Sequence, residues 1–295
     1  MGDGMKGKLP KRSMPSTRRS EGKIGLDVID YYGRMADEDK RVNLDIGRFE
    51  YVRTKEIIGR YLSSRPRTVV DVGGGTGAYS FWLAELGHHV HLVDIVPRHI
   101  ELARLRSLKA RRPLESLRIG EAKSLPFDDS FADVLLSMGP LYHITERRQR
   151  ILVLKESARV LKKGGIIFCA AISRFASMLD GFRSKLLGDP RFECIVDRDL
   201  ASGRHKNIVL NKDYFTTAYF HKPEELKDEM NEAGLTCEKL IGVEGPIGIM
   251  NELNEWLDKK DRFYELSLKY MKLVEEQGSL LGVSFHLLAM GRKDR

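Results

Sequence analysis

Residues 69–80, with the sequence VVDVGGGTGAYS, combine an apolar run, a carboxylate and a glycine-rich loop in an order that could hold a ligand. The loop Gly73-Gly74-Gly75-Thr76-Gly77 follows the apolar run directly, and a helical pattern follows the loop. Glycines tolerate positive φ and let a ligand approach the backbone closely. A loop that ends where a helix begins presents free N–H groups. The segment therefore predicts a nucleotide-type ligand at the carboxyl edge of a parallel sheet.

The glycine pattern alone leaves two ligand classes open. Gly73, Gly75 and Ala78 also fit the dinucleotide fingerprint G-x-G-x-x-G/A. Asp94, 19 residues after Gly75, would bind a ribose in either case. Asp71 is more selective, because a carboxylate two residues before the glycines repels a pyrophosphate and suits a ligand with an ammonium group. A phosphate loop of the ATP-binding type is excluded, since Gly-Lys-Ser/Thr does not follow.

A second segment, GEAKSLPFDDSFADVLLSMGPLYHI at 120–144, adds to this pattern. Together the two segments resemble the class I S-adenosylmethionine-dependent methyltransferases, in particular the group that includes the ubiquinone and menaquinone biosynthesis enzymes. The resemblance covers about residues 49–172 and becomes only architectural beyond them. It implies S-adenosyl-L-methionine as the cofactor.

The resemblance also implies which residues bind that cofactor. The glycine loop would hold the methionine part and the sugar, the acid after the second strand would bind the ribose hydroxyls, and an N-terminal aromatic residue would close over the site. Glu121 stands where the family often has Asp, so its arm is one methylene longer. The expected cofactor-binding residues are Tyr32, Asp71, Gly73, Gly74, Gly75, Gly77, Asp94, Ile95, Glu121, Ala122 and Met138.

On the acceptor side, methyl transfer is an in-line displacement that mainly needs alignment and exclusion of water. A base is required only where the acceptor must lose a proton. We expect His143, Tyr142 and His221 as catalytic candidates, and Tyr142, Tyr219, His221 and Glu244 as substrate-binding candidates. Tyr142, His143 and Glu244 stand at strand ends, where ligands bind in such sheets, and Tyr219 and His221 stand at the end of the first insertion. For both histidines, a helix cap or a backbone hydrogen bond is the structural alternative.

These residues need a sheet to position them. Strand-like segments at 68–72, 89–94, 117–120, 132–137 and 165–172 alternate with helical segments near 77–86, 97–110 and 145–162. This alternation predicts an α/β fold: a Rossmann-like, mostly parallel seven-stranded sheet with helices on both faces and two lid-type insertions. The later elements are a helix at 223–234 and strands at 235–243 and 282–290.

The expected organisation has five parts. They are a disordered basic tail at 1–23, a helical extension at 24–64, the cofactor-binding core at 65–172, a lid insertion at 173–221, and the completion of the sheet at 222–295 with a helical insertion at about 246–281. In the last insertion, Phe263, Leu266, Tyr270 and Leu273 lie on one helical stripe.

The net charge of +8 suggests nucleic acid, but its distribution argues otherwise. Residues 1–23 hold seven lysines and arginines against two acids, whereas the rest of the chain holds 43 against 40. The three cysteines lack metal-site spacing, so we expect no metal and reduced thiols in a cytoplasmic protein. No apolar run reaches the ~20 residues of a membrane span.

The sequence thus predicts an S-adenosylmethionine-dependent methyltransferase for a small-molecule acceptor, a monomer or homodimer without a membrane partner. The alternatives are an RNA or other nucleic-acid methyltransferase anchored by the basic tail, an NAD(P)-dependent oxidoreductase, and a binding protein that kept the fold without turnover. Against the nucleic-acid alternative, the chain has neither an Asn/Asp-Pro-Pro-Tyr/Phe element nor a Pro-Cys pair. The acceptor and the atom methylated are not specified by the sequence.

Overall fold

The computed structural model describes residues 45–62, 64–207, 215–251 and 253–294 of the chain. The tail at 1–23, Tyr32 and most of the expected helical extension lie outside the described residues. Within that extension, helix α3 (Asp45–Gly59) is described, and its Phe49, Ile57 and Ile58 are buried.

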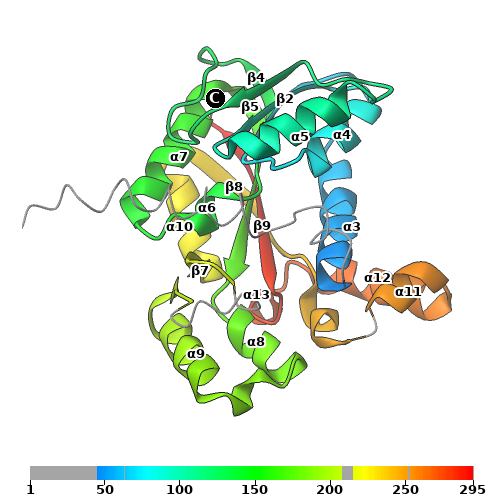
Figure 1. Cartoon of the computed structure of the whole chain (residues 1–295), viewed down its shortest axis with the longest axis vertical. Helices are drawn as coiled ribbons and strands as arrows, with labels where there is room; N and C mark the ends of the chain where they lie inside the picture. The colour runs from blue at the N-terminus through cyan, green and yellow to red at the C-terminus, as the bar shows by residue number, and fades with distance from the viewer. Residues whose placement is uncertain (1–44, 63, 208–214, 252, 295) are drawn as a thin grey trace, which may run out of the picture.

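A twisted sheet forms the centre of the molecule, in the order β3-β2-β1-β4-β5-β9-β8 (Figure 1). All neighbouring pairs from β3 to β5 are parallel, while β9 runs antiparallel to both β5 and β8. This confirms the prediction of a mostly parallel sheet with seven core strands. The strands are β1 (Thr68–Val72), β2 (His89–Asp94), β3 (Ser116–Ile119), β4 (Ala132–Ser137), β5 (Leu161–Ser173), β8 (Leu235–Gly242) and β9 (His286–Lys293).

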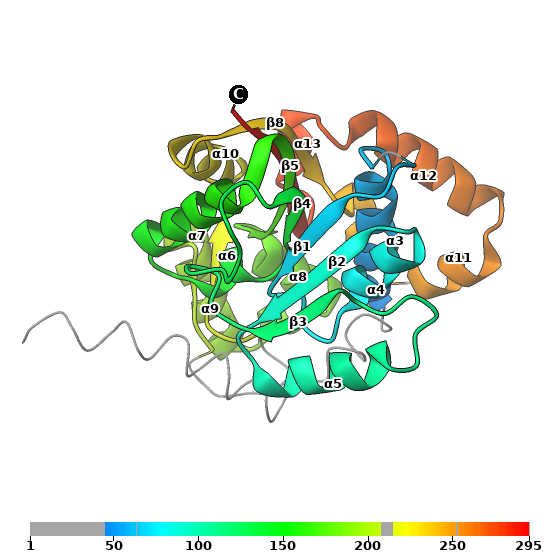
Figure 2. The ribbon, with the colours of Figure 1, turned by 90° about the horizontal axis from the view of Figure 1, so that it is seen from above.

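Helices cover both faces of the sheet, because its strands are apolar on both sides. In β4, Val134 and Leu136 pack with α3, α4 and α5, while Leu135 packs on the opposite face with α7 and α10. Figure 2 shows the sheet between these two helical layers. The helices are α4 (Ala78–Glu85), α5 (Pro97–Ser107), α6 (Pro140–His143), α7 (Arg147–Val160) and α10 (Pro223–Glu232).

The segment between β5 and α10 lies beyond the carboxyl end of β5 (Figure 1). It contains α8 (Ala176–Arg183), a 3₁₀ turn (Leu186–Gly188), α9 (Pro190–Ser202), and the hairpin strands β6 (Arg204–His205) and β7 (Ala218–His221). β7 pairs in parallel with Ile172 and Ser173, the last two residues of β5. The hairpin therefore extends the sheet at the edge where a ligand would bind.

The segment between β8 and β9 is helical, with a 3₁₀ turn (Gly245–Ile249), α11 (Leu253–Lys259), α12 (Arg262–Val274) and α13 (Gly278–Leu281). The stripe of Phe263, Tyr270 and Leu273 faces solvent, with 50–65% of each residue exposed. The packed face of α12 is instead Tyr264, Leu268 and Met271, which contact the cluster around Phe49. The predicted last strand also begins later than expected, at His286, because α13 and the turn after it occupy 278–285.

Candidate functional site

The glycine loop joins β1 to α4 and takes the backbone path that its sequence predicts. Gly73, Gly75 and Gly77 all have positive φ, at 67°, 59° and 90°. Gly74 is required for a different reason, since a Cβ there would lie 2.5 Å from Asp71 Oδ2. The loop is fixed to the neighbouring strand by a hydrogen bond from Gly73 N–H to the carbonyl of Val93 at 2.7 Å.

Asp71 lies beneath this loop and is fully buried. Its Oδ2 accepts a 2.6 Å hydrogen bond from Ser80 Oγ, whereas Oδ1 has no hydrogen-bond partner among the described residues. Burial, and to a smaller extent the charge of Asp94, raise the pKa of Asp71 to about 7. A buried carboxylate with an unsatisfied oxygen is costly, so the position favours a cationic hydrogen-bond donor in the site.

Asp94, at the end of β2, holds the loop from the other side. Its Oδ2 accepts the N–H of Gly75 at 2.8 Å, and its Oδ1 accepts the N–H of Val96 at 2.8 Å. His99 Nδ1 lies 3.2 Å from the same Oδ1. Asp94 therefore organises both the glycine loop and the start of α5, and the expected contact with a ribose stays a prediction.

The remaining residues expected at the cofactor lie at neighbouring strand ends. Ile95 follows β2 directly. Glu121 is exposed and forms an isolated backbone bridge with Ser124. Ala122 is half-buried against one core cluster, and Met138, after β4, is buried in the other. The structure thus gathers these residues at the carboxyl edge of the sheet, while their contacts with a ligand stay predictions.

Tyr142 and His143 end the short helix α6 and form an aromatic group with Phe215, which precedes β7. The rings of Tyr142 and His143 are 4.7 Å apart, and the rings of His143 and Phe215 are stacked at 5.9 Å. Helix α6, which follows β4, and the first insertion therefore meet at a wall of aromatic rings. Phe215 was not among the sequence candidates, because nothing in an isolated phenylalanine before a strand marks it as functional.

Tyr219 and His221 lie on β7 but face away from that wall. The Tyr219 ring packs on the guanidinium of Arg150 at 3.7 Å, and its hydroxyl donates to Glu225 Oε2 at 3.1 Å. His221 is fully buried with Nε2 3.4 Å from Glu229, and this burial lowers its pKa. Both side chains belong to a buried polar network behind the hairpin, so the geometry does not favour direct contact with a methyl acceptor.

Glu244, which follows β8, is fully buried and accepts three hydrogen bonds. Ser284 Oγ and the N–H of His286 donate to Oε2 at 2.8 and 3.0 Å, and His286 Nδ1 lies 2.5 Å from Oε1. Burial raises the pKa of Glu244, but the charge and hydrogen bonds of His286 outweigh it and the net shift is downward. Glu244 thus orients His286, which the sequence did not single out because its partner is 42 residues away.

Comparison with known proteins finds a family model that matches part of the chain. A family model for the methyltransferase domain matches residues 70–169. Residues 70–169 form a methyltransferase domain. The match covers the glycine loop, Asp94, the segment around Glu121 and the α6 aromatic residues. It implies S-adenosylmethionine as the cofactor, as the sequence predicted.

Two relatives illustrate how far this similarity extends. Cypemycin N-terminal methyltransferase from a Streptomyces species is 37% identical over 109 residues, which are 36% of this chain and 43% of that protein. A ubiquinone biosynthesis O-methyltransferase from Chelativorans is 27% identical over 277 residues, 89% of this chain and 97% of that protein. The chain thus spans less than half the length of the first relative and nearly all of the second.

Solved structures have a similar fold over most of this chain. An S-adenosylmethionine-dependent methyltransferase from Methanosarcina mazei has a TM-score of 0.56 at 18% identity, covering 81% of this chain and 97% of that one. One from Thermotoga maritima has a TM-score of 0.54 at 20% identity, covering 91% and 99%. No helix among the described residues is long and apolar enough to cross a membrane.

The residues of the methyltransferase domain fit the cofactor that the family implies. The unsatisfied Oδ1 of Asp71 suits the ammonium group of a methionine moiety. The absence of a Cβ at Gly74 leaves the backbone open where a side chain would collide with Asp71 and Leu92.

Proposed function

We propose that the chain is an S-adenosylmethionine-dependent methyltransferase that acts on a small-molecule acceptor. The observation that supports it most directly is the unsatisfied oxygen of Asp71 beneath the glycine loop. When bound, the cofactor supplies a methyl group on a sulfonium, which is already an activated leaving group. The chain then needs to hold the cofactor, align the acceptor and keep water out.

On the cofactor side, Asp71 accepts hydrogen bonds from the ammonium group, and the glycine loop lies along the methionine part and the sugar. Asp94 binds the ribose hydroxyls while its second oxygen keeps α5 in place. Ile95 and Glu121 lie beside the adenine, and Ala122 and Met138 complete the cofactor site, as the family resemblance implies. In these assignments the cofactor is held by acidic side chains and by a preformed backbone cradle.

On the acceptor side, the aromatic wall of Tyr142, His143 and Phe215 favours a planar ring. Glu244 and His286 lie at the same carboxyl edge, since His286 pairs with Ile172 near the end of β5. A histidine held by a carboxylate is the arrangement that a general base needs, because the carboxylate fixes its tautomer and orientation. We assign His286 this role where the acceptor must lose a proton, with His143 as the alternative.

The first experiment measures binding of S-adenosylhomocysteine and of NAD(P) by isothermal titration calorimetry. We expect saturable binding of S-adenosylhomocysteine only, and Asp71→Asn to weaken it by about tenfold or more, the size expected for a hydrogen bond to a charged group. Asp133→Asn is the matched control, because Asp133 bonds Thr68 N–H near the opposite edge of the sheet. Binding of NAD(P) alone would contradict the proposal.

The second experiment screens methyl acceptors with isotopically labelled cofactor. For any acceptor found, we expect His143→Ala or His286→Ala to lower kcat more than the affinity for S-adenosylhomocysteine. Tyr219→Phe is the control, since its ring packs behind the hairpin on Arg150. If Tyr219→Phe lowered kcat as much as the histidine variants, the acceptor would lie on the other side of the hairpin from the aromatic wall.

A further inference from the structure

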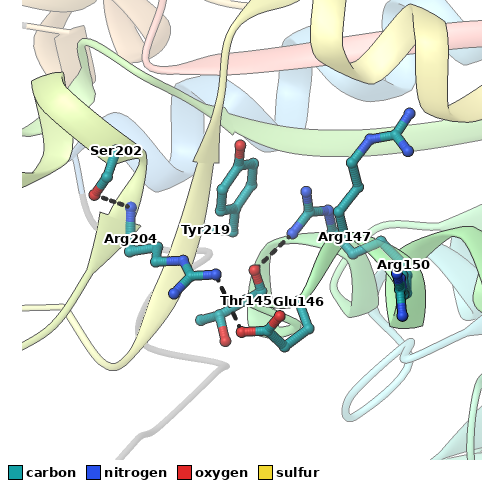
Figure 3. A pocket seen from close by; sticks show the side chains of 8 residues that line it. Thr145, Glu146, Arg147, Arg150, Ser202, Arg204 and Tyr219 are labelled. Carbon is teal, nitrogen blue, oxygen red and sulfur yellow. Dashed lines mark hydrogen bonds and ion pairs between the residues drawn. The ribbon is translucent and has the colours of Figure 1, made fainter.

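A pocket of about 580 Å³ lies between the start of α7 and the β6–β7 hairpin, away from the glycine loop. Four arginines line it, Arg147, Arg148 and Arg150 from α7 and Arg204 from β6, together with one acid, Glu146. Figure 3 shows Arg204 reaching from the hairpin toward Glu146, with Tyr219 between the two elements. Neither the cofactor nor the acceptor roles proposed above use this pocket.

The four arginines are not equivalent, because Arg147 and Arg150 form ion pairs with glutamates of α10. Arg150 is fully buried and forms a bidentate pair with Glu229, at 2.6 and 2.9 Å. Its Nη1 donates to the carbonyls of Ile144 and Thr145, both at 3.0 Å. Arg147 pairs with Glu232 at 2.7 Å. Arg150 therefore forms the floor of the pocket and carries Tyr219, rather than offering its own donors.

The other two arginines leave positive charge at the pocket mouth. Arg204 is 60% exposed and has one carboxylate partner, Glu146 at 3.2 Å. Arg148 is exposed and makes no hydrogen bond or ion pair among the described residues. Exposed ion pairs such as Arg204–Glu146 contribute little stability and exchange readily for a better partner. The carboxylate of Glu146 thus occupies the position beside Arg204 where an oxygen of an anionic ligand could bind.

We propose that Arg148 and Arg204 form an oxyanion-binding site for the phosphate or sulfate group of a small molecule. Guanidinium groups match such oxyanions because their planar donors bond two oxygens at once. The concave wall concentrates the potential of the arginines, and the start of α7 adds the positive end of its dipole. Glu146 competes with the ligand for Arg204, so its carboxylate must move aside when the oxyanion binds.

The ligand is a molecule other than the methyl acceptor, because the hairpin separates the two sites. Alternate residues of a strand point to opposite faces. Phe220 packs with Phe215 and Tyr142 on the face of the aromatic wall, whereas Tyr219 lines the pocket on the other face. A small oxyanion in the pocket can therefore bind together with the cofactor rather than in its place.

The test titrates the full chain with inorganic phosphate and with pyrophosphate at constant ionic strength, by calorimetry. We expect saturable binding, and a loss of about tenfold in affinity for Arg148→Gln and for Arg204→Gln. Arg111→Gln, which removes an exposed arginine after α5, should leave the affinity unchanged. Glu146→Gln should strengthen binding, because it removes the competing carboxylate. The helix should not suffer, since the Glu146 side chain makes no capping hydrogen bond to α7.

Each variant is first checked for folding by its thermal midpoint and for S-adenosylhomocysteine binding, which separates a failure of this proposal from a failure of the proposed function. Absence of saturable phosphate and pyrophosphate binding would overturn the site. So would an equal loss in Arg111→Gln, or weaker binding by Glu146→Gln. A short RNA oligomer that binds through Arg148 and Arg204, while neither phosphate does, would make the surface a nucleic-acid contact instead. If phosphate displaced S-adenosylhomocysteine, the oxyanion would bind at the glycine loop and the proposal would fail.

Discussion

Asp71 and Ser80 are joined by a 2.6 Å hydrogen bond that uses one carboxylate oxygen of Asp71 and leaves the other without a described partner. The pair links the end of β1 to the first turn of α4 across the glycine loop. The single bond from Ser80 does not offset full burial, so the pKa of Asp71 rises to about 7. The carboxylate is thus arranged to be completed by a ligand rather than by the protein itself.

The affinity for S-adenosylhomocysteine should therefore depend on pH around neutrality. If the ammonium group binds the ionised form of Asp71, affinity increases as pH rises through 7 and falls by up to about tenfold per unit below it. Calorimetry between pH 6 and 8 measures this dependence. Asp71→Asn should bind weakly with a flat profile, and a wild-type profile that is equally flat would contradict the role of Asp71.

The raised pKa of Asp71 also makes the stability of the ligand-free protein depend on pH, but stability falls as pH rises, whereas ligand affinity increases. A folded-state pKa above the ordinary value means that the folded state binds more protons than the unfolded state. The contribution of Asp71 to the free energy of unfolding therefore decreases as pH rises from about 4 toward 7. Urea denaturation of the wild type and Asp71→Asn across this range should show the difference, and S-adenosylhomocysteine should reduce it.

Gly74→Ala should damage the site, whereas Gly188→Ala should not. A Cβ at Gly74 would lie 2.3 Å from Leu92 Cδ1 and 2.5 Å from Asp71 Oδ2, so these buried side chains or the loop must shift. Overpacking of this kind costs about 1–3 kcal/mol. A Cβ at Gly188 meets nothing within 4 Å. Chemical denaturation and S-adenosylhomocysteine titration of both variants test this, and equal behaviour of the two would contradict the steric argument.

Much of the core could be predicted from local patterns. The bounds of β1, β2 and β4 match the sequence expectation residue for residue, because buried parallel strands appear as short continuous apolar runs. The glycine loop was found for a similar reason, since its chemistry is local. Phe263 and Tyr270 lie on the helix α12, as expected, but they are exposed, because periodicity identifies a helical face and does not say whether another element covers it.

The partners of the acceptor-side residues could not be predicted. Glu244 was chosen as the end of a strand, but its pairing with His286 depends on β9 lying between β5 and β8. His221 was chosen because it ends the first insertion, yet the pleat of β7 turns it into the network of Arg150 and Glu229. Which face a side chain takes on a four-residue strand is decided by pairing register, which no local pattern contains.

Breaking the Arg150–Glu229 pair should destabilise the protein strongly. Both side chains are 1% exposed, and the loss of either leaves the other buried charge without its bidentate partner. Such losses cost about 3–5 kcal/mol. Urea denaturation of Arg150→Met and Glu229→Gln should give values in this range, while Lys259→Ala, which removes one partner of an exposed pair with Glu255, should change stability by under about 0.5 kcal/mol.

The same pair predicts loss of stability in acid. Burial raises the pKa of Glu229, but its hydrogen bonds from His221 and Arg150 outweigh this and bring it to about 2. A depressed pKa contributes stability that is present above the ordinary value of 4.5 and is lost as pH falls toward 2. Glu229→Gln should therefore lose less stability than the wild type between pH 5 and pH 3, as measured by urea denaturation. A wild-type curve parallel to that of the variant would exclude this contribution.

Glu244→Gln should separate orientation of His286 from binding of the cofactor. The variant keeps the shape of the side chain and the hydrogen bond from Ser284, but removes the charge that fixes Nδ1 of His286. With an acceptor that must lose a proton, we expect kcat to fall by about 10–100-fold, the size of a positioned base, with S-adenosylhomocysteine affinity unchanged. The acidic limb of the kcat profile should also move, because a purely structural role would lower kcat equally at every pH. Unchanged kcat and an unmoved profile would assign the deprotonation to His143 instead. In that case His143→Ala should lower kcat more than His286→Ala does.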